Sequence, residues 1–256
     1  MKTVRKALAL LHFFTVSQPS WGLSDLARAA GLDKAGTLRL LKPLVDDQLL
    51  EQEPRSRQYR LGSGLLNLAR IREVCYPLGS VVQPILHRLA QATGEVAHAS
   101  VIGRQGMLTI GVATSSQRAT QVMVDPSELL PFHATASGIA CLAFGEATWS
   151  ANTLKTLEFD AITPNTPADR KVLNLAIADA KRLGYASTSG TFENEATGIA
   201  VPYFDGQSVV QGAIAIVAPS SRVTADQIQN FAQLLNQAAQ EVTLAIGGLW
   251  PIKTFD

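Results

Sequence analysis

Residues 23–47, LSDLARAAGLDKAGTLRLLKPLVDD, decide the fold of the N-terminal part of this chain. Apolar side chains recur at helical spacing on both sides of Gly31, and glycine is the residue most often found where a helix ends in left-handed backbone. The pattern predicts a helix over residues 23–30, a turn over 31–34 and a second helix over about 35–47. Two short helices joined by a tight turn are typical of helix-turn-helix domains, although any small amphipathic helix pair has the same pattern.

The second of these helices is predicted to have two faces of different chemistry. Its apolar face holds Leu38, Leu41, Leu44 and Val45. Its opposite face holds Lys34, Thr37, Arg39 and Lys42. Pro43 argues against an unbroken helix, because an interior proline removes a backbone hydrogen bond and costs about 3 kcal/mol. We therefore expect a kink or an early end near Lys42.

The next segment, residues 54–61, PRSRQYRL, is rich in arginine. Short strand-like runs over residues 49–53 and 58–61 flank a turn that carries Arg55 and Arg57. A hairpin in water has no need of cations at its tip, whereas a hairpin along a phosphate backbone gains from each of them by counterion release. Together with an amphipathic helix over residues 3–15, this hairpin predicts a winged helix that binds DNA.

The charge of the chain is unevenly distributed. Residues 1–72 hold twelve Lys and Arg against six Asp and Glu, a net of +6, whereas residues 73–256 hold ten against fifteen, a net of −5. A basic segment joined to a mildly acidic one is expected when only the first of them meets phosphate.

The composition excludes several classes of protein. A chain with 46% hydrophobic and 17% charged residues is expected to fold rather than to be disordered. The apolar run in residues 1–14 is amphipathic and no small-residue cleavage site follows it, which argues against a signal peptide. No stretch reaches the roughly 18 apolar residues of a membrane span, so we expect no membrane partner. Cys75 and Cys141 lie far apart, which indicates a reducing cytoplasm rather than a disulfide framework.

The remaining residues predict an α+β domain behind a linker helix. The glycines of residues 62–72, GSGLLNLARIR, indicate a flexible entry to that helix, and Pro77, Gly79 and Pro84 interrupt the chain before the next one. Helical patterns follow over residues 85–93, 135–145, 169–183 and 224–246, the last capped by Thr224. Strand patterns cover residues 96–102, 107–112, 120–124, 198–203 and 209–217. We expect an antiparallel-leaning sheet flanked by helices.

Patterns for catalysis or metal binding are weak. The four histidines lack metal-ligand spacing, so we expect no metal and no cofactor, and we expect His133 to support its neighbouring helix rather than to line a cavity. Ser137 lacks the flanking glycines of a nucleophile elbow. Glu193 and Glu195 form a close carboxylate pair, which we expect in water on a loop. Cys141, within an apolar run, is expected in the core.

Seven blocks follow one another along the chain: VRKALALLHFF, DLARAAGL, RLLKPLVDDQLL, YRLG, LLPFHATASGIACLAF, AKRLGYA and AVPYFD. Their order and spacing resemble the IclR-type bacterial transcriptional regulators over nearly the whole chain. The resemblance implies a winged helix-turn-helix over residues 1–62, a linker helix over 63–80, and a GAF-like α/β domain for effector binding and oligomerisation over 81–256. It also implies homodimers, often paired into dimers of dimers, on double-stranded operator DNA.

The recognition helix departs from the family pattern at its start. Ala35 and Gly36 stand where the family usually has Ser-Thr, and the loss of a serine cap costs about 1 kcal/mol unless another residue compensates. Arg39 matches the family arginine, for which base readout and a structural or phosphate contact are both open. The expected DNA-binding residues are Lys34, Thr37, Leu38, Arg39, Lys42, Arg55, Arg57 and Arg60.

The resemblance also places an effector cavity in the second domain. Four positions that are an acid, a cysteine and two serines in members that bind small carboxylates are here Thr188, Gly198, Ala215 and Val217. Further expected lining residues are Ala136 and Ser137, at a helix N-terminus that could accept an anion, and Ala119 and Val122 on the facing side. The wall has lost hydroxyls, so we expect a small-molecule effector less polar than glyoxylate or pyruvate, an aromatic or longer-chain organic acid.

These patterns predict a ligand-responsive transcriptional regulator of a small-molecule catabolic or metabolic operon, with a repressor favoured over an activator. Two alternatives remain open from the residues alone. One is an enzyme or ligand-binding protein whose DNA-binding module is vestigial. The other is a constitutive DNA-binding regulator whose pocket is closed by apolar side chains.

Overall fold

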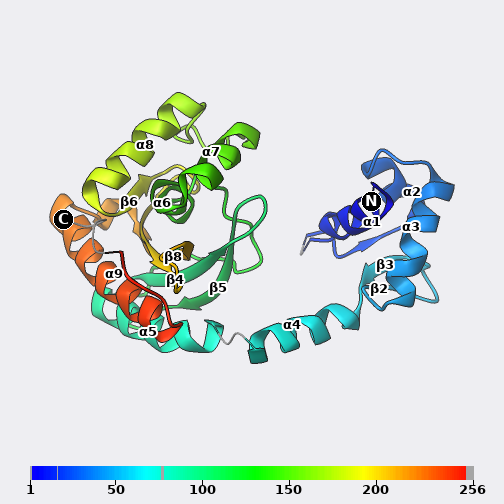
Figure 1. Ribbon diagram of the computed structural model, residues 1–256, viewed down its shortest axis with the longest axis horizontal. Helices are drawn as coiled ribbons and strands as arrows, with labels where there is room; N and C mark the ends of the chain where they lie inside the picture. The colour runs from blue at the N-terminus through cyan, green and yellow to red at the C-terminus, as the bar shows by residue number, and fades with distance from the viewer. Residues whose placement is uncertain (1, 16, 76–77, 252–256) are drawn as a thin grey trace. The chain divides into compact units, whose positions relative to one another are not determined.

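The computed structural model describes residues 2–15, 17–75 and 78–251. The chain divides into two compact units, Met1–Pro77 and Leu78–Asp256, which are described separately (Figure 1). Pro77, expected to interrupt the chain, lies outside the described residues. Among the described helices, none is long and apolar enough to cross a membrane.

The first unit holds four α-helices, one 3-10 helix and three short strands among its described residues. In chain order these are α1 (Lys2–Ala9), η1 (Leu10–Phe13), β1 (Ser20–Trp21), α2 (Leu23–Ala29), α3 (Lys34–Asp46), β2 (Leu50–Gln52), β3 (Tyr59–Leu61) and α4 (Ser63–Cys75). The expected first helix over residues 3–15 is therefore divided into α1 and a 3-10 turn. Its core joins η1, α2, α3 and the hairpin through Leu10, Leu26, Leu41, Leu44 and Leu50.

The helix-turn-helix has the predicted order, and its turn contains the expected left-handed glycine, Gly31, at φ 63°. The serine cap that α3 lacks is compensated by Asp33, because its Oδ1 accepts a 2.7 Å hydrogen bond from the backbone N–H of Gly36. The early end expected near Lys42 as an alternative to a kink was wrong, since α3 continues through Pro43 to Asp46.

The wing is part of a three-stranded antiparallel sheet of order β1-β3-β2. Strand β1 was not predicted; it pairs Ser20 with Arg60 and Trp21 with Tyr59. The Trp21 indole N–H donates to the carbonyl of Phe13 at 2.7 Å and so ties the sheet to the end of η1. A two-residue strand carries too little sequence pattern to be recognised.

The glycines at the start of α4 are required for close packing rather than for flexibility, which corrects the expectation. A Cβ on Gly62 would overlap the backbone carbonyl oxygen of Gln48, and one on Gly64 would lie 2.8 Å from it. The N–H of Gly64 donates to that same oxygen at 2.9 Å. The start of the linker helix is therefore held against the β2 side of the first unit.

The second unit is an antiparallel sheet with helices on both faces. Its elements are α5 (Leu78–Thr93), β4 (Val96–Ile102), β5 (Met107–Ala113), α6 (Ala136–Phe144), α7 (Ala147–Thr156), α8 (Arg170–Leu183), β6 (Ala186–Ser189), β7 (Ala196–Phe204), β8 (Val210–Pro219), η2 (Ser220–Arg222) and α9 (Ala225–Ala245). The five strands have the order β5-β4-β8-β7-β6. The α+β fold with an antiparallel sheet is confirmed.

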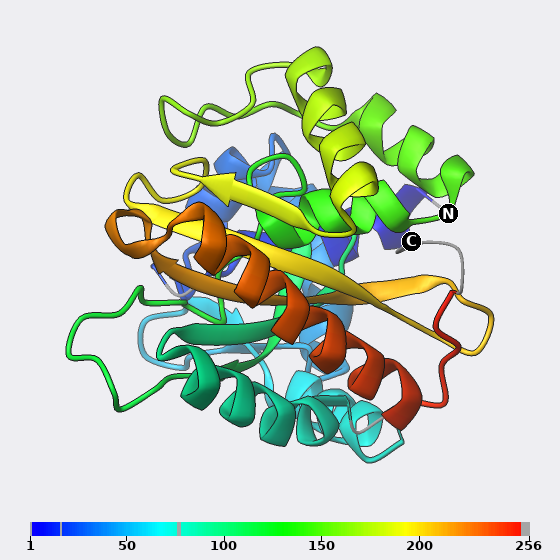
Figure 2. The same ribbon diagram turned by 90° about the vertical axis from the view of Figure 1, so that its left-hand side faces the viewer.

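Alternate side chains of each strand enter two separate cores. Ile214 and Ile216 of β8 face α5 and α9, which lie side by side across one face of the sheet (Figure 2). Ala213 and Ala215 of the same strand face α6 and, beyond it, α8. This period of two, set by the pleat of the strand, separates a large apolar core from a second face that carries small residues.

Two predictions for the second unit were wrong, and two elements were missed. Helix α5 begins at Leu78 rather than after Pro84, and it continues through this proline, which lacks only its own backbone N–H as a donor. Residues 120–124 are not a strand: residues 114–129 form a long loop after β5, and Leu130 makes an isolated bridge to Met107. Helix α7 and strand β6 were not predicted.

Candidate functional site

The exposed face of α3 carries two lysines and one leucine at a spacing of four residues. Lys34, Leu38 and Lys42 therefore form one stripe, with Arg39 beside it, and all four side chains are exposed. Leu38 was expected on the buried face of the helix, but it is 47% exposed. Its exposure gives the stripe an apolar contact between two cations.

Thr37 has the opposite placement and corrects the expected face. Its side chain is 0% exposed, and its hydroxyl donates to the carbonyl oxygen of Asp33 at 2.9 Å. The hydroxyl therefore serves the first turn of α3 and does not lie on the exposed stripe.

The turn between β2 and β3 presents Arg55 and Arg57, both exposed. Glu53 shapes this turn, because one of its carboxylate oxygens accepts from the backbone N–H groups of Arg55 at 2.9 Å and Ser56 at 2.6 Å. Those hydrogen bonds, the one from Ser56 first, hold the pKa of Glu53 below its usual range. Arg57 has left-handed backbone at φ 59°, which directs the chain back into β3.

Arg60 differs from the two arginines of the turn because it has a carboxylate partner. Its Nη2 lies 3.1 Å from Oε2 of Glu51 on the neighbouring strand. The pKa of Glu51 is lowered by the backbone N–H of Ser63 and then by Arg60. Part of the Arg60 charge is thus neutralised within the protein, whereas Arg55 and Arg57 keep theirs.

A recessed pocket lies in the second unit, on the α6 face of the sheet. One row of its floor crosses three strands, since Val217 of β8 pairs with Gly198 of β7 and Gly198 pairs with Thr188 of β6. A second row pairs Ala215 with His98 of β4. All five residues line the pocket, so the register of the sheet brings together four positions that the sequence alone left unconnected.

The first turn of α6 and the loop after β5 complete the pocket. Ala136 and Ser137 line it from the helix, and Val122 and Val124 line it from the loop. Together the walls surround about 590 Å³ of space, part of it open to solvent. Ala119 was expected here, but it is exposed and lies outside the lining.

His98 is a buried polar residue of the pocket floor that the sequence did not single out. Its side chain is 5% exposed, and burial lowers its pKa from 6.5 to about 4, so the ring is neutral at pH 7. Its Nε2 lies 3.4 Å from the hydroxyl oxygen of Ser137. Its other ring nitrogen, Nδ1, has no hydrogen-bond partner among the described residues.

Three carboxylates, Asp125, Glu128 and Glu193, also line the pocket. Glu193 and Glu195 are both exposed on the loop between β6 and β7, as expected, but Glu193 also lines the pocket, where partial burial and the charge of Glu128 raise its pKa. Asp125 is paired locally, because the N–H and hydroxyl of Ser127 donate to its Oδ1 and lower its pKa. Among the described lining residues there is no lysine or arginine.

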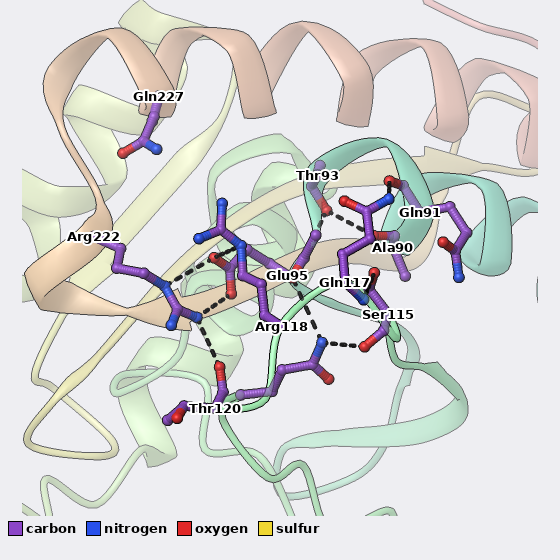
Figure 3. A network of polar contacts seen from close by, with 12 residues as sticks. Ala90, Gln91, Thr93, Glu95, Ser115, Gln117, Arg118, Thr120, Arg222 and Gln227 are labelled. Atoms are coloured by element: carbon purple, nitrogen blue, oxygen red, sulfur yellow. Dashed lines mark hydrogen bonds and ion pairs between the residues drawn. The ribbon is translucent and has the colours of Figure 1, made fainter.

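The loop that supplies Val122, Val124 and Asp125 is held by a buried ion pair (Figure 3). The carboxylate of Glu95, 3% exposed, accepts from Arg222 Nε at 3.1 Å and Nη2 at 2.8 Å, and Arg118 Nε lies 3.4 Å away.

Two carbonyls of this loop accept hydrogen bonds from side chains. Arg222 donates to the carbonyl of Thr120 at 3.0 Å (Figure 3), and the Gln121 side chain donates to the carbonyl of Ser115 at 2.5 Å. Both carbonyls therefore have partners without the pairing of a strand.

Other candidate groups do not enter the pocket. His133 supports the start of α6 from outside: its Nε2 is 3.1 Å from the carbonyl oxygen of Asp160 and its ring contacts Phe159 edge-on. Cys141 is buried in α6, and burial raises the pKa of its thiol. Within the described ranges, no group of three His, Cys, Asp or Glu side chains has the arrangement to hold a metal.

A helix-turn-helix with a cationic wing, joined in one chain to an α+β unit with a recessed pocket, defines a class of ligand-responsive DNA-binding regulators. Two family models match the chain: "IclR helix-turn-helix domain" over residues 3–54 and "Bacterial transcriptional regulator IclR C-terminal" over residues 75–244. The chain therefore belongs to the IclR family. It is a transcriptional regulator with a DNA-binding and an effector-binding domain, and not an enzyme.

Individual proteins agree with this assignment. The crystal structure of an IclR transcriptional regulator from Silicibacter sp. TM1040 is 38% identical, with a TM-score of 0.91 over 99% of both chains. The transcriptional repressor IclR of Escherichia coli (strain K12) is 27% identical over 97% of this chain and 91% of its own. An IclR homolog from Microbacterium hydrocarbonoxydans, crystallised with 4-hydroxybenzoate, is 25% identical, with a TM-score of 0.75 over 95% of this chain and 98% of its own.

Proposed function

We propose that this protein is a repressor that binds operator DNA through its first unit and changes its DNA affinity when a small molecule fills the pocket of its second unit. It acts in the cytoplasm on an operon for the metabolism of a small molecule. The functional division is a DNA-binding domain over residues 1–62, a linker over 63–80 and an effector and oligomerisation domain over 81–256. The name of the Escherichia coli relative supports repression rather than activation.

One observation carries the proposal: five exposed cations of the first unit lie on the recognition helix and on the turn of the wing. Lys34, Arg39 and Lys42 extend from α3, and Arg55 and Arg57 extend from the hairpin turn. A helix of this kind enters the major groove, while wing cations contact phosphates. Arg60 remains in the set, with a smaller contribution because Glu51 neutralises part of its charge.

We assign Leu38 an apolar contact in the groove, since it is exposed between the two lysines of the stripe. The DNA partner is a pseudo-palindromic operator bound by a homodimer, or by a dimer of dimers. Two copies related by a two-fold axis present the same helix to two half-sites, which is why such operators are palindromic.

The effector-binding residues of the proposal are those that line the pocket: Val122, Ala136, Ser137, Thr188, Gly198, Ala215 and Val217. Most of these side chains are small or apolar, which supports an effector with an apolar body such as an aromatic ring. The Microbacterium relative, which was crystallised with 4-hydroxybenzoate, supports a ring of that size. The carboxylates of the lining repel a negatively charged ligand, so they support an aromatic effector but not an organic acid.

Fluorescence anisotropy on the duplex upstream of the gene tests the DNA-binding surface. Arg39→Ala should weaken binding about tenfold or more, and Arg55→Ala should weaken it on any sequence and lower the salt slope by about one. Arg182→Ala is the matched control, because Arg182 is also exposed but lies on α8 in the second unit. Wild-type affinity in both Arg39→Ala and Arg55→Ala would refute the assigned surface.

A further inference from the structure

We propose that the effector of this regulator carries two polar groups on an aromatic body: an ammonium group, which binds between Glu128 and Glu193 at the mouth of the pocket, and a hydrogen-bonding group, which lies at His98 in the floor. The inference rests on the proposed function and names the chemical class of ligand for the same site. It differs from the organic acid that the resemblance led us to expect.

The lining of the pocket is acidic. Glu128 and Glu193 come from the loop after β5 and from the segment between β6 and β7, and both line one pocket. Neither carboxylate has a hydrogen-bond or ion-pair partner among the described residues, whereas Asp125 is already paired with Ser127. Two unpaired carboxylates repel each other, and a cation between them removes that repulsion.

Independently of this charge, the floor of the pocket contains a polar group without a partner among the described residues. His98 lines the pocket, is 95% buried and leaves its Nδ1 without a partner in the part of the chain that the structure describes. A buried polar atom without a hydrogen bond is costly, so a ligand that supplies one gains free energy. The pocket therefore favours a ligand that has a polar group at His98 and a cation at the mouth.

The opposing feature is the first turn of α6, whose backbone N–H groups favour negative charge. A helix N-terminus is equivalent to only about half an elementary charge. The hydroxyl of Thr135 already accepts from the N–H of Gly138 in this turn. Three carboxylates without a lysine or arginine among the described lining residues outweigh that partial charge.

The apolar walls select the body of the ligand. Ala136, Val122 and Val217 surround the space between the mouth and the floor. Gly198 keeps this space open, since a Cβ there would lie 3.4 Å from the Ala136 methyl group. An aromatic ring with a short aminoalkyl chain fits this distribution of apolar and acidic groups.

Three compounds that share one phenol ring test the head group: 4-(2-aminoethyl)phenol, 4-(2-hydroxyethyl)phenol and 3-(4-hydroxyphenyl)propanoate. In all three the phenol hydroxyl supplies the polar group for His98. Isothermal titration of the full-length chain should give the amine an affinity about tenfold above the alcohol, and the acid the weakest. Glu128→Gln and Glu193→Gln should each reduce the affinity for the amine about tenfold and leave the alcohol unchanged. Glu195→Gln is the matched control, because Glu195 is exposed and does not line the pocket.

The glutamine variants should fold at least as stably as the wild type, because each removes the repulsion between Glu128 and Glu193; thermal unfolding without ligand checks this. Three results would overturn the inference: the acid binds most tightly, the affinity for the amine is unchanged in both glutamine variants, or none of the three compounds binds at millimolar concentration. The proposed function is tested separately, by measuring DNA binding of the same preparations. It still holds if the acid, rather than the amine, changes the affinity for DNA.

Discussion

The two units of this chain place their functional side chains in opposite environments. In the first unit, Lys34, Arg39 and Arg55 are exposed on a short helix and a hairpin turn. In the second, His98 and Ser137 are 5% and 2% exposed at the floor of a pocket. A phosphate backbone is recognised by charges on the surface, whereas a small molecule is recognised by groups taken out of water.

The largest expected effect concerns the buried ion pair of the second unit. Arg222→Ala leaves Glu95 buried with only Arg118, and we expect a loss of about 3 kcal/mol in the free energy of unfolding. Arg88→Ala, which removes an exposed partner of Glu241, should cost at most about 1 kcal/mol. Urea unfolding of both variants measures the difference.

Equal losses in the two variants would contradict the role of this network. Arg222 also donates to the carbonyl of Thr120 in the loop that carries Val122. We therefore expect Arg222→Ala, and not Arg88→Ala, to weaken ligand binding in the pocket.

The next effect depends on pH and belongs to His98. Its pKa is 6.5 when unfolded and about 4 when folded, so the unfolded state binds more protons between these values and stability falls as pH is lowered. About 2 kcal/mol should be lost from this residue between neutral pH and pH 5. In His98→Gln that part of the pH dependence should disappear.

Urea midpoints of the wild type and His98→Gln at the two pH values provide the measurement. Parallel pH dependence in the two proteins would mean that His98 is not neutral and buried as described. The first unit offers no equivalent residue, because its one histidine, His12, is exposed.

The smallest effect separates two neighbours in the recognition helix. Thr37→Val removes the hydrogen bond to the Asp33 carbonyl and should cost about 1 kcal/mol of stability. Leu38→Ala should change stability by less than about 0.5 kcal/mol, because Leu38 is exposed, but should weaken DNA binding. If Thr37→Val instead kept its stability and lost DNA affinity, the assignment of Thr37 to helix stability and of Leu38 to DNA contact would be wrong.

The sequence predicted the first unit well, because charge and helical periodicity are local properties. It misplaced Thr37 and Leu38, since both lie near the boundary of the apolar stripe and the packing against the rest of the unit decides which is buried. It also missed Asp33 as a cap, because the prediction compared only the family's usual serine position.

The second unit was less predictable, because its pocket is assembled by pairing of distant strands. Seven of the eight expected lining residues were located through family resemblance and not through local pattern, and the eighth, Ala119, lies on a loop mistaken for the approach to a strand. Glu128 and Glu193 are far apart in sequence, so no local pattern could show that their charges meet. Alternation along β4 placed His98 on one face but could not show that a cavity lies above it.

The central claim is that the two units are coupled, so that occupancy of the pocket changes the affinity for DNA. The direct measurement is the anisotropy titration of upstream duplex with the full-length chain, alone and with saturating 4-(2-aminoethyl)phenol, 4-(2-hydroxyethyl)phenol or 3-(4-hydroxyphenyl)propanoate. The account predicts that a compound that fills the pocket shifts the dissociation constant for DNA at least about fivefold, and that the shift is reduced in Arg222→Ala. An unchanged dissociation constant, with the pocket shown to be occupied by calorimetry, would contradict it.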